Sequence, residues 1–163
     1  MHFHPLHPAL VHFPIACWVL AVPCDIAGWL YMPQAWYAAY LLILGGVVLA
    51  LPAMLAGMPD LAKLKNNKTV MAVAYRHIGL IGSAWILYLV SLMLRVGKGR
   101  TPAEAPGVAA SACALIGLML LLAGAWHGAE LVYSYGIGIR RRRSLSSQPV
   151  SRQQPLESTT EKN

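Results

Sequence analysis

Histidines are the residues in this chain whose type and spacing could support chemistry. Six occur in 163 residues, as many as all the aspartates and glutamates together. Four of them crowd into the opening sequence MHFHPLHPALVHFPIA, where His7 precedes a proline and His12 lies inside an apolar run. His77 opens a later apolar run, and His127 lies near the end of the last one, within WHGAELVY. An imidazole can ligate a metal, or carry a proton near neutral pH.

Three chemistries fit such histidines, and the sequence leaves them open. Two neutral imidazoles from different helices could hold a haem iron from its two axial sides, as in membrane b-type cytochromes. A histidine with Glu130 or Asp60 could bind a divalent metal ion. A histidine beside a tyrosine or an acid could instead hydrogen-bond a quinone carbonyl and move its proton. The plainer alternative is that the histidines lie hydrated at a membrane interface or cap helix ends, and for His7 a capping role is favoured.

The candidate site combines these histidines with one acid. The predicted cofactor-binding residues are His12, His77, His127 and Glu130, and the predicted ligands of a haem iron or divalent metal are His7, His12 and His127. Glu130 follows His127 by three residues, so both should lie on one face of a helix. An unpaired carboxylate inside a membrane is costly, so we expect Arg76 or His77 to pair with Glu130. No catalytic nucleophile, phosphate loop or dinucleotide glycine motif is recognisable in the sequence.

The composition places most of the chain in lipid. Hydrophobic residues make up 57% of it and charged residues only 12%, with a mean hydropathy of +0.53. A soluble domain of this size needs more charge to cover its surface. Four apolar runs, each near the roughly 20 residues that cross a bilayer, occupy residues 9–31, 36–57, 78–96 and 108–133. Because lipid leaves no water for free backbone groups, these runs should be helices.

We therefore predict an all-α integral membrane protein with one bundle of four transmembrane helices over residues 1–139. Residues 140–163 read as a basic and then disordered cytoplasmic tail. Both termini and the connection between the second and third spans should share one side, which holds Lys63, Lys65, Lys68, Arg76 and Arg140 to Arg143, against Arg95, Lys98 and Arg100 on the opposite side. Since the richer side is normally cytoplasmic, both termini are expected in the cytoplasm.

The same charge clusters bear on partners. Because the clusters lie beside apolar spans, they favour membrane lipid headgroups as partners. They argue against nucleic acid as a partner, because a protein that binds nucleic acid needs a folded polar surface. His12, His77 and His127 should approach the cytoplasmic leaflet. Asp25 lies about 19 Å further along its helix than His12 and belongs near the outer leaflet. Cys17, Cys24 and Cys113 are expected to be free thiols.

Small residues indicate where helices pack closely. Gly124 and Gly128 form one such pair, and Gly46, Ala50, Ala53 and Gly57 form a stripe on the second span. We find no convincing internal repeat in the sequence, which argues against a transporter because many transporters contain one.

The motifs HPALVHFPIA, DIAGW, AGMPDL, YRHIGL and GAELVYSYGIGI resemble those of the four-helix bacterial membrane proteins grouped as domain of unknown function 2231, over about residues 7–139. The resemblance implies that His7, His12, His77, Gly128, Glu130, Tyr133 and Gly136 are motif positions. Some members of that family are joined to Rieske-type iron–sulfur modules, which implies redox work and a Rieske-type partner. Where relatives tend to read GGELVYRHG, this chain has Ala129 and Tyr135, so a typical histidine is absent.

Three functions therefore remain as hypotheses. The first is a redox or electron-transfer component that binds b-type haem or quinone through histidines on the cytoplasmic side. The second is a non-catalytic membrane assembly or anchor protein, and the third is a small metal-handling or transport protein. A second copy of the chain is a further possible partner.

Overall fold

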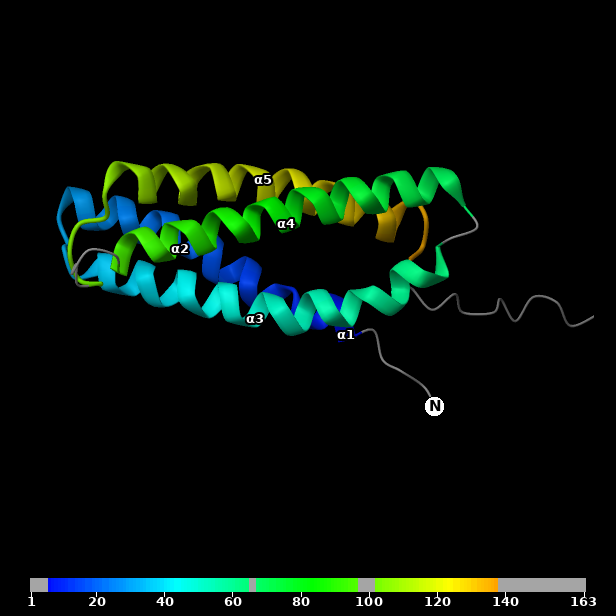
Figure 1. Ribbon diagram of the computed structural model, residues 1–163, viewed down its shortest axis with the longest axis horizontal. Helices are drawn as coiled ribbons and strands as arrows, with labels where there is room; N and C mark the ends of the chain where they lie inside the picture. The colour runs from blue at the N-terminus through cyan, green and yellow to red at the C-terminus, as the bar shows by residue number, and fades with distance from the viewer. Residues whose placement is uncertain (1–5, 65–66, 97–101, 138–163) are drawn as a thin grey trace, which may run out of the picture.

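The computed structural model describes residues 6–64, 67–96 and 102–137, in which every long element is an α-helix (Figure 1). The helices are α1 (Leu6–Leu10), α2 (His12–Leu30), α3 (Ala35–Lys63), α4 (Lys68–Val96) and α5 (Val108–Tyr133). Only Val11 separates α1 from α2, and the two form one span. Pro14 accounts for the break, because it has no N–H to offer the carbonyl of Leu10.

Within the described residues, four helical stretches are long and apolar enough to cross a membrane, as the sequence predicted: His7–Leu30, Ala35–Ala62, Lys68–Val96 and Val108–Tyr133. The all-α class is confirmed as well. Helix α3 runs past the predicted end at Gly57, and α4 begins well before the predicted start at Ile78. The proposed tail, like His2 and His4, lies outside the described residues.

Packing explains why α4 begins earlier than the sequence predicted. Its first turns are amphipathic, with Val70, Val73 and Ala74 buried against Leu131 of α5. Lys68 and Arg76 are exposed on the same turns. A helix boundary predicted from a continuous apolar run stops at such charged residues. A helix that buries only one apolar stripe can continue through them, because the charges lie on its exposed side.

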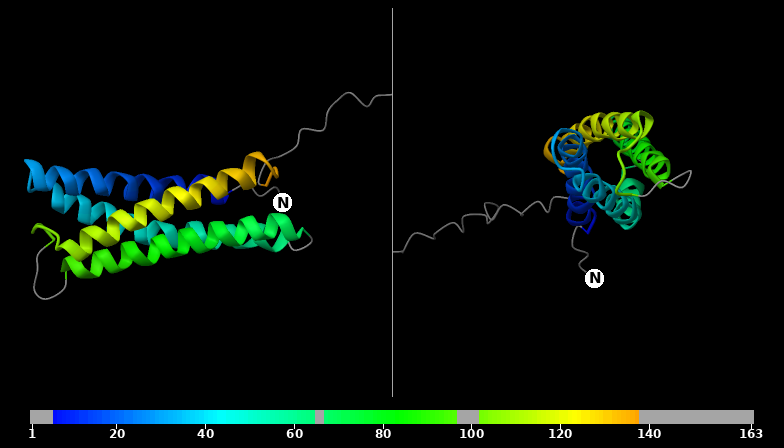
Figure 2. Two further views of the ribbon diagram at one scale, coloured as in Figure 1. Left: turned by 90° about the horizontal axis from the view of Figure 1, so that it is seen from above. Right: turned by 90° about the vertical axis from the view of Figure 1, so that its left-hand side faces the viewer.

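The helices form two hairpins. Helix α2 packs along α3 and α4 packs along α5, each pair far more extensively than the hairpins contact one another. Viewed down the bundle, α2 and α4 lie on opposite sides of the interior, and so do α3 and α5 (Figure 2). Helices α2 and α4 run in the same direction (Figure 1). The second hairpin therefore repeats the direction of the first.

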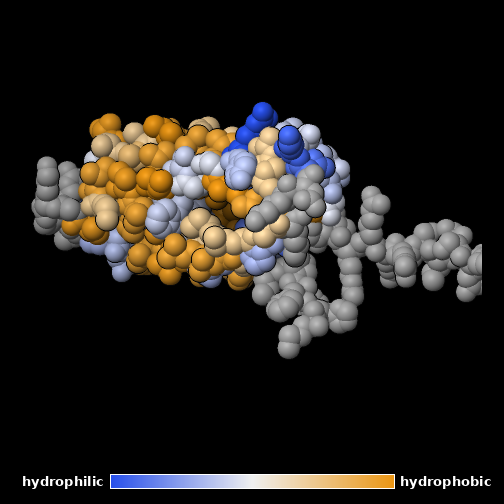
Figure 3. All heavy atoms as spheres, turned by 45° about the vertical axis from the view of Figure 1, so that its right-hand side comes forward, coloured by the Kyte–Doolittle hydropathy of each residue, from blue (hydrophilic) through white to orange (hydrophobic). Residues whose placement is uncertain are grey.

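The two ends of the bundle differ in chemistry. We call the end where α1 and α4 begin and α5 finishes the histidine end, because it carries His7, His77 and His127. The opposite end carries Asp25 and Arg95, and we call it the ion-pair end. Between them the core is apolar and centres on Trp18, Tyr88, Ile43 and Leu121. In the space-filling view, hydrophobic residues cover most of the bundle and hydrophilic ones gather toward the histidine end (Figure 3).

Candidate functional site

His7 and His77 make matching hydrogen bonds at the histidine end. His7 Nδ1 lies 2.6 Å from the carbonyl oxygen of Ala53 on α3. His77 Nδ1 lies 2.8 Å from the carbonyl oxygen of Gly124 on α5. A carbonyl oxygen can only accept, so Nδ1 of each ring carries a proton and donates it. In the neutral ring this assignment leaves the Nε2 lone pair available to a ligand.

Each of these imidazoles packs against a glycine one turn beyond the carbonyl that it contacts. A Cβ placed on Gly57 would lie 3.0 Å from the ring of His7. A Cβ placed on Gly128 would likewise lie 3.0 Å from the ring of His77. These two glycines therefore make room for the rings, which explains the small-residue stripes that the sequence placed on α3 and α5. The predicted capping role of His7 is replaced by this contact with α3.

The two rings thus occupy equivalent places in the two hairpins. Each extends from the first helix of a hairpin, contacts the second, and is partly buried. His77 lies within electrostatic range of both His7 and His127. The structure therefore brings His7, His77 and His127 to one end of the bundle, although they are far apart in the sequence.

His127 pairs with Glu130 on its own helix. His127 Nδ1 lies 3.3 Å from Glu130 Oε2, and the side chains are 25% and 35% exposed. The prediction that the two share a face is confirmed. The prediction that Arg76 or His77 would partner Glu130 is wrong, because the His127 ring is one turn away and reaches the carboxylate first.

His12 does not join the other histidines. It is exposed at the start of α2, while His7 one helical turn earlier faces α3. Five residues at 3.6 residues per turn set the two side chains about 140° apart around the helix, so they lie on different faces. His12 is therefore placed apart from the His7 and His77 rings.

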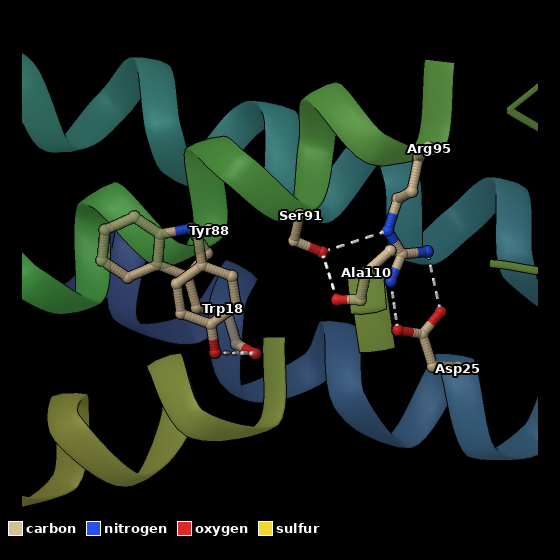
Figure 4. Close-up of polar contacts among 6 residues, drawn as sticks. All are labelled: Trp18, Asp25, Tyr88, Ser91, Arg95 and Ala110. Atoms are coloured by element: carbon tan, nitrogen blue, oxygen red, sulfur yellow. Dashed lines mark hydrogen bonds and ion pairs between the residues drawn. The ribbon is translucent and has the colours of Figure 1, made fainter. Parts of the chain in front are cut away.

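An ion pair that the sequence analysis missed lies at the opposite end of the bundle (Figure 4). Arg95 on α4 faces Asp25 on α2 through two hydrogen bonds, one of them 2.9 Å between Arg95 Nη1 and Asp25 Oδ1 and the other between Nη2 and Oδ2. Arg95 is 4% exposed and Asp25 6% exposed. The side chains lie between diagonally opposed helices, so the pair bridges the two hairpins.

Neighbouring groups complete this network. Arg95 Nε lies 3.5 Å from Ser91 Oγ, and Ser91 Oγ donates a 2.7 Å hydrogen bond to the carbonyl oxygen of Ala110. The sequence had counted Arg95 as an orientation signal beside a loop, which is wrong for a buried, paired guanidinium. The missed signal was an acid in one apolar run and a base in another at matching depth, because a buried charge needs a partner.

An aromatic pair lies between the two polar ends. The rings of Trp18 and Tyr88 stack with centroids 4.8 Å apart and planes 4° apart. Tyr88 Oη donates a 3.4 Å hydrogen bond to the carbonyl oxygen of Trp18. Both residues are fully buried, so they join the two hairpins at mid-bundle (Figure 4).

A divalent-metal site receives little support from this geometry. In residues 6–64, 67–96 and 102–137 no group of three or more His, Cys, Asp or Glu side chains is placed to hold a metal ion. Cys17, Cys24 and Cys113 are free thiols, as predicted. His7 and His77 are the two histidines whose Nδ1 contacts a backbone carbonyl of the neighbouring helix in the described residues.

Comparison with known proteins gives one match. A family model described as predicted membrane protein (DUF2231) matches residues 3–141. No curated protein and no solved structure matches the chain.

Proposed function

We propose that this chain, which belongs to the DUF2231 family of predicted membrane proteins, is a membrane electron-transfer component that binds b-type haem between its hairpins. His7 and His77 are the residues that would hold the haem iron. The observation that carries the proposal is that each ring donates Nδ1–H to a backbone carbonyl and keeps Nε2 for a ligand. Metal-ligating histidines in proteins are typically fixed in this way by a hydrogen bond from the other ring nitrogen.

The placement of the two rings supports axial ligation. A haem iron in a membrane b-type cytochrome takes one imidazole from each side of the ring. His7 lies against α3 within the first hairpin and His77 lies against α5 within the second, so the two rings come from different hairpins at one end of the bundle. Gly57 and Gly128 hold the imidazoles close to α3 and α5, which fixes the ring planes. A bound haem would supply one-electron transfer, and the chain's part is to bind it and to exclude water.

Quinone fits these two rings less well. A quinone carbonyl is a hydrogen-bond acceptor and needs a donor from the protein. The donor nitrogen of each neutral ring is already engaged by Ala53 or Gly124. Nε2 offers a lone pair, which suits an iron and repels a carbonyl oxygen. The ligand assignment also departs from the sequence hypothesis in giving His12 and His127 no axial role.

The membrane setting is part of the proposal. We place the protein in a bacterial inner membrane with both termini and the histidine end on the cytoplasmic side. The exposed Lys68 and Arg76 at that end support contact with anionic lipid headgroups there. A Rieske-type protein is the proposed redox partner, because the histidine end is where an electron would enter or leave.

A non-catalytic anchor is the second candidate function. The Asp25–Arg95 pair and the Trp18–Tyr88 stack support it, because both are buried contacts that fix the two hairpins together. The two candidates differ in one respect that can be measured. An anchor needs no ligand at the histidine end.

Addition of haemin to the purified full chain in detergent tests the haem proposal. We expect saturable binding at one haem per chain and a Soret band that shifts on reduction. His7→Ala and His77→Ala should each weaken binding at least tenfold. His12→Ala is the matched control and should bind as the wild type does. Absence of binding by the wild type, or a loss of binding confined to His12→Ala, would contradict the proposal.

A further inference from the structure

The contacts inside the first hairpin recur inside the second. His7 with Ala53 and Gly57 in the first corresponds to His77 with Gly124 and Gly128 in the second, by hydrogen bond and by ring contact. Both imidazoles use the same nitrogen and meet the same turn of the neighbouring helix. The two hairpins therefore resemble each other in the atoms that make these contacts as well as in the direction of their helices.

A second set of contacts repeats further into the bundle. Trp18 lies so close to Gly46 that a Cβ there would be 2.3 Å from the indole nitrogen. Tyr88 lies against Gly117, where a Cβ would be 3.1 Å from its ring. In each hairpin, an aromatic residue of the first helix thus packs onto a glycine of the second.

These equivalences follow a single offset. Trp18 and Tyr88 are 70 residues apart, and so are Asp25 and Arg95. His7 and His77 have the same separation, and the glycines of the second helices are separated by one residue more. An offset that changes by only one residue over three levels of the bundle indicates two copies of one hairpin.

The sequence analysis found no convincing repeat, and the equivalences between the hairpins lie in their contacts. The equivalent positions are ones that contact a neighbouring helix, and many of the residues between them are exposed on the outside of the bundle. At equivalent places one aromatic residue replaces another, as Tyr88 replaces Trp18. One small residue likewise replaces another, and one charged residue replaces another. Letter-by-letter similarity is consequently weak while the contacts are preserved.

The two hairpins are related by rotation about the long axis of the bundle. Helices α2 and α4 run in the same direction on opposite sides of the interior (Figures 1 and 2). Such parallel repeats are related by an axis along the membrane normal. Trp18 stacks on Tyr88, and Asp25 pairs with Arg95, so each of these contacts joins a position to its own equivalent. Both contacts must therefore lie close to the axis.

We propose that the chain is an internal duplication of one helical hairpin, and that the Asp25–Arg95 pair selects the pairing of the first hairpin with the second. At an axis position, two first hairpins from different copies would bring two Asp25 carboxylates together. Two second hairpins would bring two Arg95 guanidinium groups together. Only a first hairpin with a second gives opposite charges, and buried like charges are strongly disfavoured. The remaining axis contact, the aromatic stack, would form between like hairpins as well.

Charge reversal in the full chain tests this inference. Asp25→Arg places Arg against Arg95, and Arg95→Asp places Asp against Asp25, so each variant lacks any complementary pairing within or between its own copies. We expect at least a fivefold loss of folded, monodisperse protein in detergent for each. The double variant D25R/R95D restores opposite charges in reversed order and should recover at least half of the wild-type yield.

Co-expression supplies a test that does not depend on either single variant folding alone. Differently tagged D25R and R95D chains, made in one cell, carry complementary charges only across chains. We expect them to copurify as a two-chain assembly at several times the yield of either alone, whereas tagged wild-type chains remain separate. The inference is overturned if D25R/R95D folds no better than D25R, if either single variant folds as the wild type does, or if the co-expressed chains do not copurify. Haem binding enters none of these measurements, so their failure and that of the proposed function are distinguishable.

Discussion

Substitution of Gly46 by alanine should destabilise the bundle at its centre. The added Cβ would lie 2.3 Å from Trp18 Nε1 and 2.5 Å from Cδ1, well inside contact distance. The indole cannot move aside freely, because it is 1% exposed and its other face stacks on Tyr88. Either the α2–α3 spacing must increase or the stack must break.

The magnitude follows from two opposing effects. Alanine favours a helix over glycine by about 1 kcal/mol. Forcing an extra carbon into a packed core costs about 1–3 kcal/mol, and more where the neighbour is rigid. Because the obstacle here is a stacked and buried ring, we take about 3 kcal/mol or more for the clash. The expected net loss in unfolding free energy is about 2 kcal/mol.

Gly45 provides the matched control on the same helix. A Cβ there would be 3.8 Å from Cys17 Sγ, an ordinary contact. Gly45→Ala should therefore be neutral or stabilise by up to about 1 kcal/mol. Gly117→Ala, with its contact at 3.1 Å from Tyr88, should fall between the two.

Unfolding of the three variants in mixed detergent, followed by circular dichroism and tryptophan fluorescence, measures this order. The reasoning is refuted if Gly46→Ala proves as stable as Gly45→Ala, or if Gly117→Ala lowers the stability more than Gly46→Ala does. Either result would mean that the helices do not approach as closely at Trp18 as the structure has them.

Three further predictions concern the polar ends of the bundle. Gly128→Ala should displace the ring of His77 and lower haemin affinity, while Gly79→Ala, whose Cβ meets nothing within 4 Å, should leave the affinity unchanged in the same titration. Ser91→Ala removes a hydroxyl that donates to the carbonyl oxygen of Ala110 within helix α5 and should cost about 0.5–1.5 kcal/mol in detergent unfolding; a wild-type midpoint would count against that hydrogen bond. His127→Ala removes a partly exposed pair and should cost under about 1 kcal/mol, with the Soret band of the haemin complex retained.

The fold was predictable because lipid constrains it strongly. Apolar length and the absence of water for backbone groups predict helices, so the four spans and the all-α class follow from the sequence. The stripes at Gly46, Gly57, Gly124 and Gly128 likewise predicted close helix packing. The start of α4 was not predictable from apolar length, because its first turns bury one stripe and expose charges on the other.

The polar contacts were harder to predict, because they depend on how the hairpins rotate relative to each other. The sequence gives the depth of Asp25 and Arg95 but does not say that they face one another. His7 and His12 illustrate the same difficulty within a few residues. Five residues separate them along a helical path, and His7 faces α3 while His12 is exposed. Only the helix path distinguishes a candidate ligand from an exposed side chain.

The central claim is that His7 and His77 together hold a haem iron. The most direct measurement is the reduced-minus-oxidised spectrum of the full chain purified from cells supplied with haem, combined with electron paramagnetic resonance of the oxidised form. The account predicts about one haem per chain with a low-spin signal typical of two imidazoles, lost or converted to high spin in His7→Ala and in His77→Ala and retained in His12→Ala. A colourless wild-type protein that also fails to take up added haemin, or a low-spin signal that survives both substitutions, would contradict it.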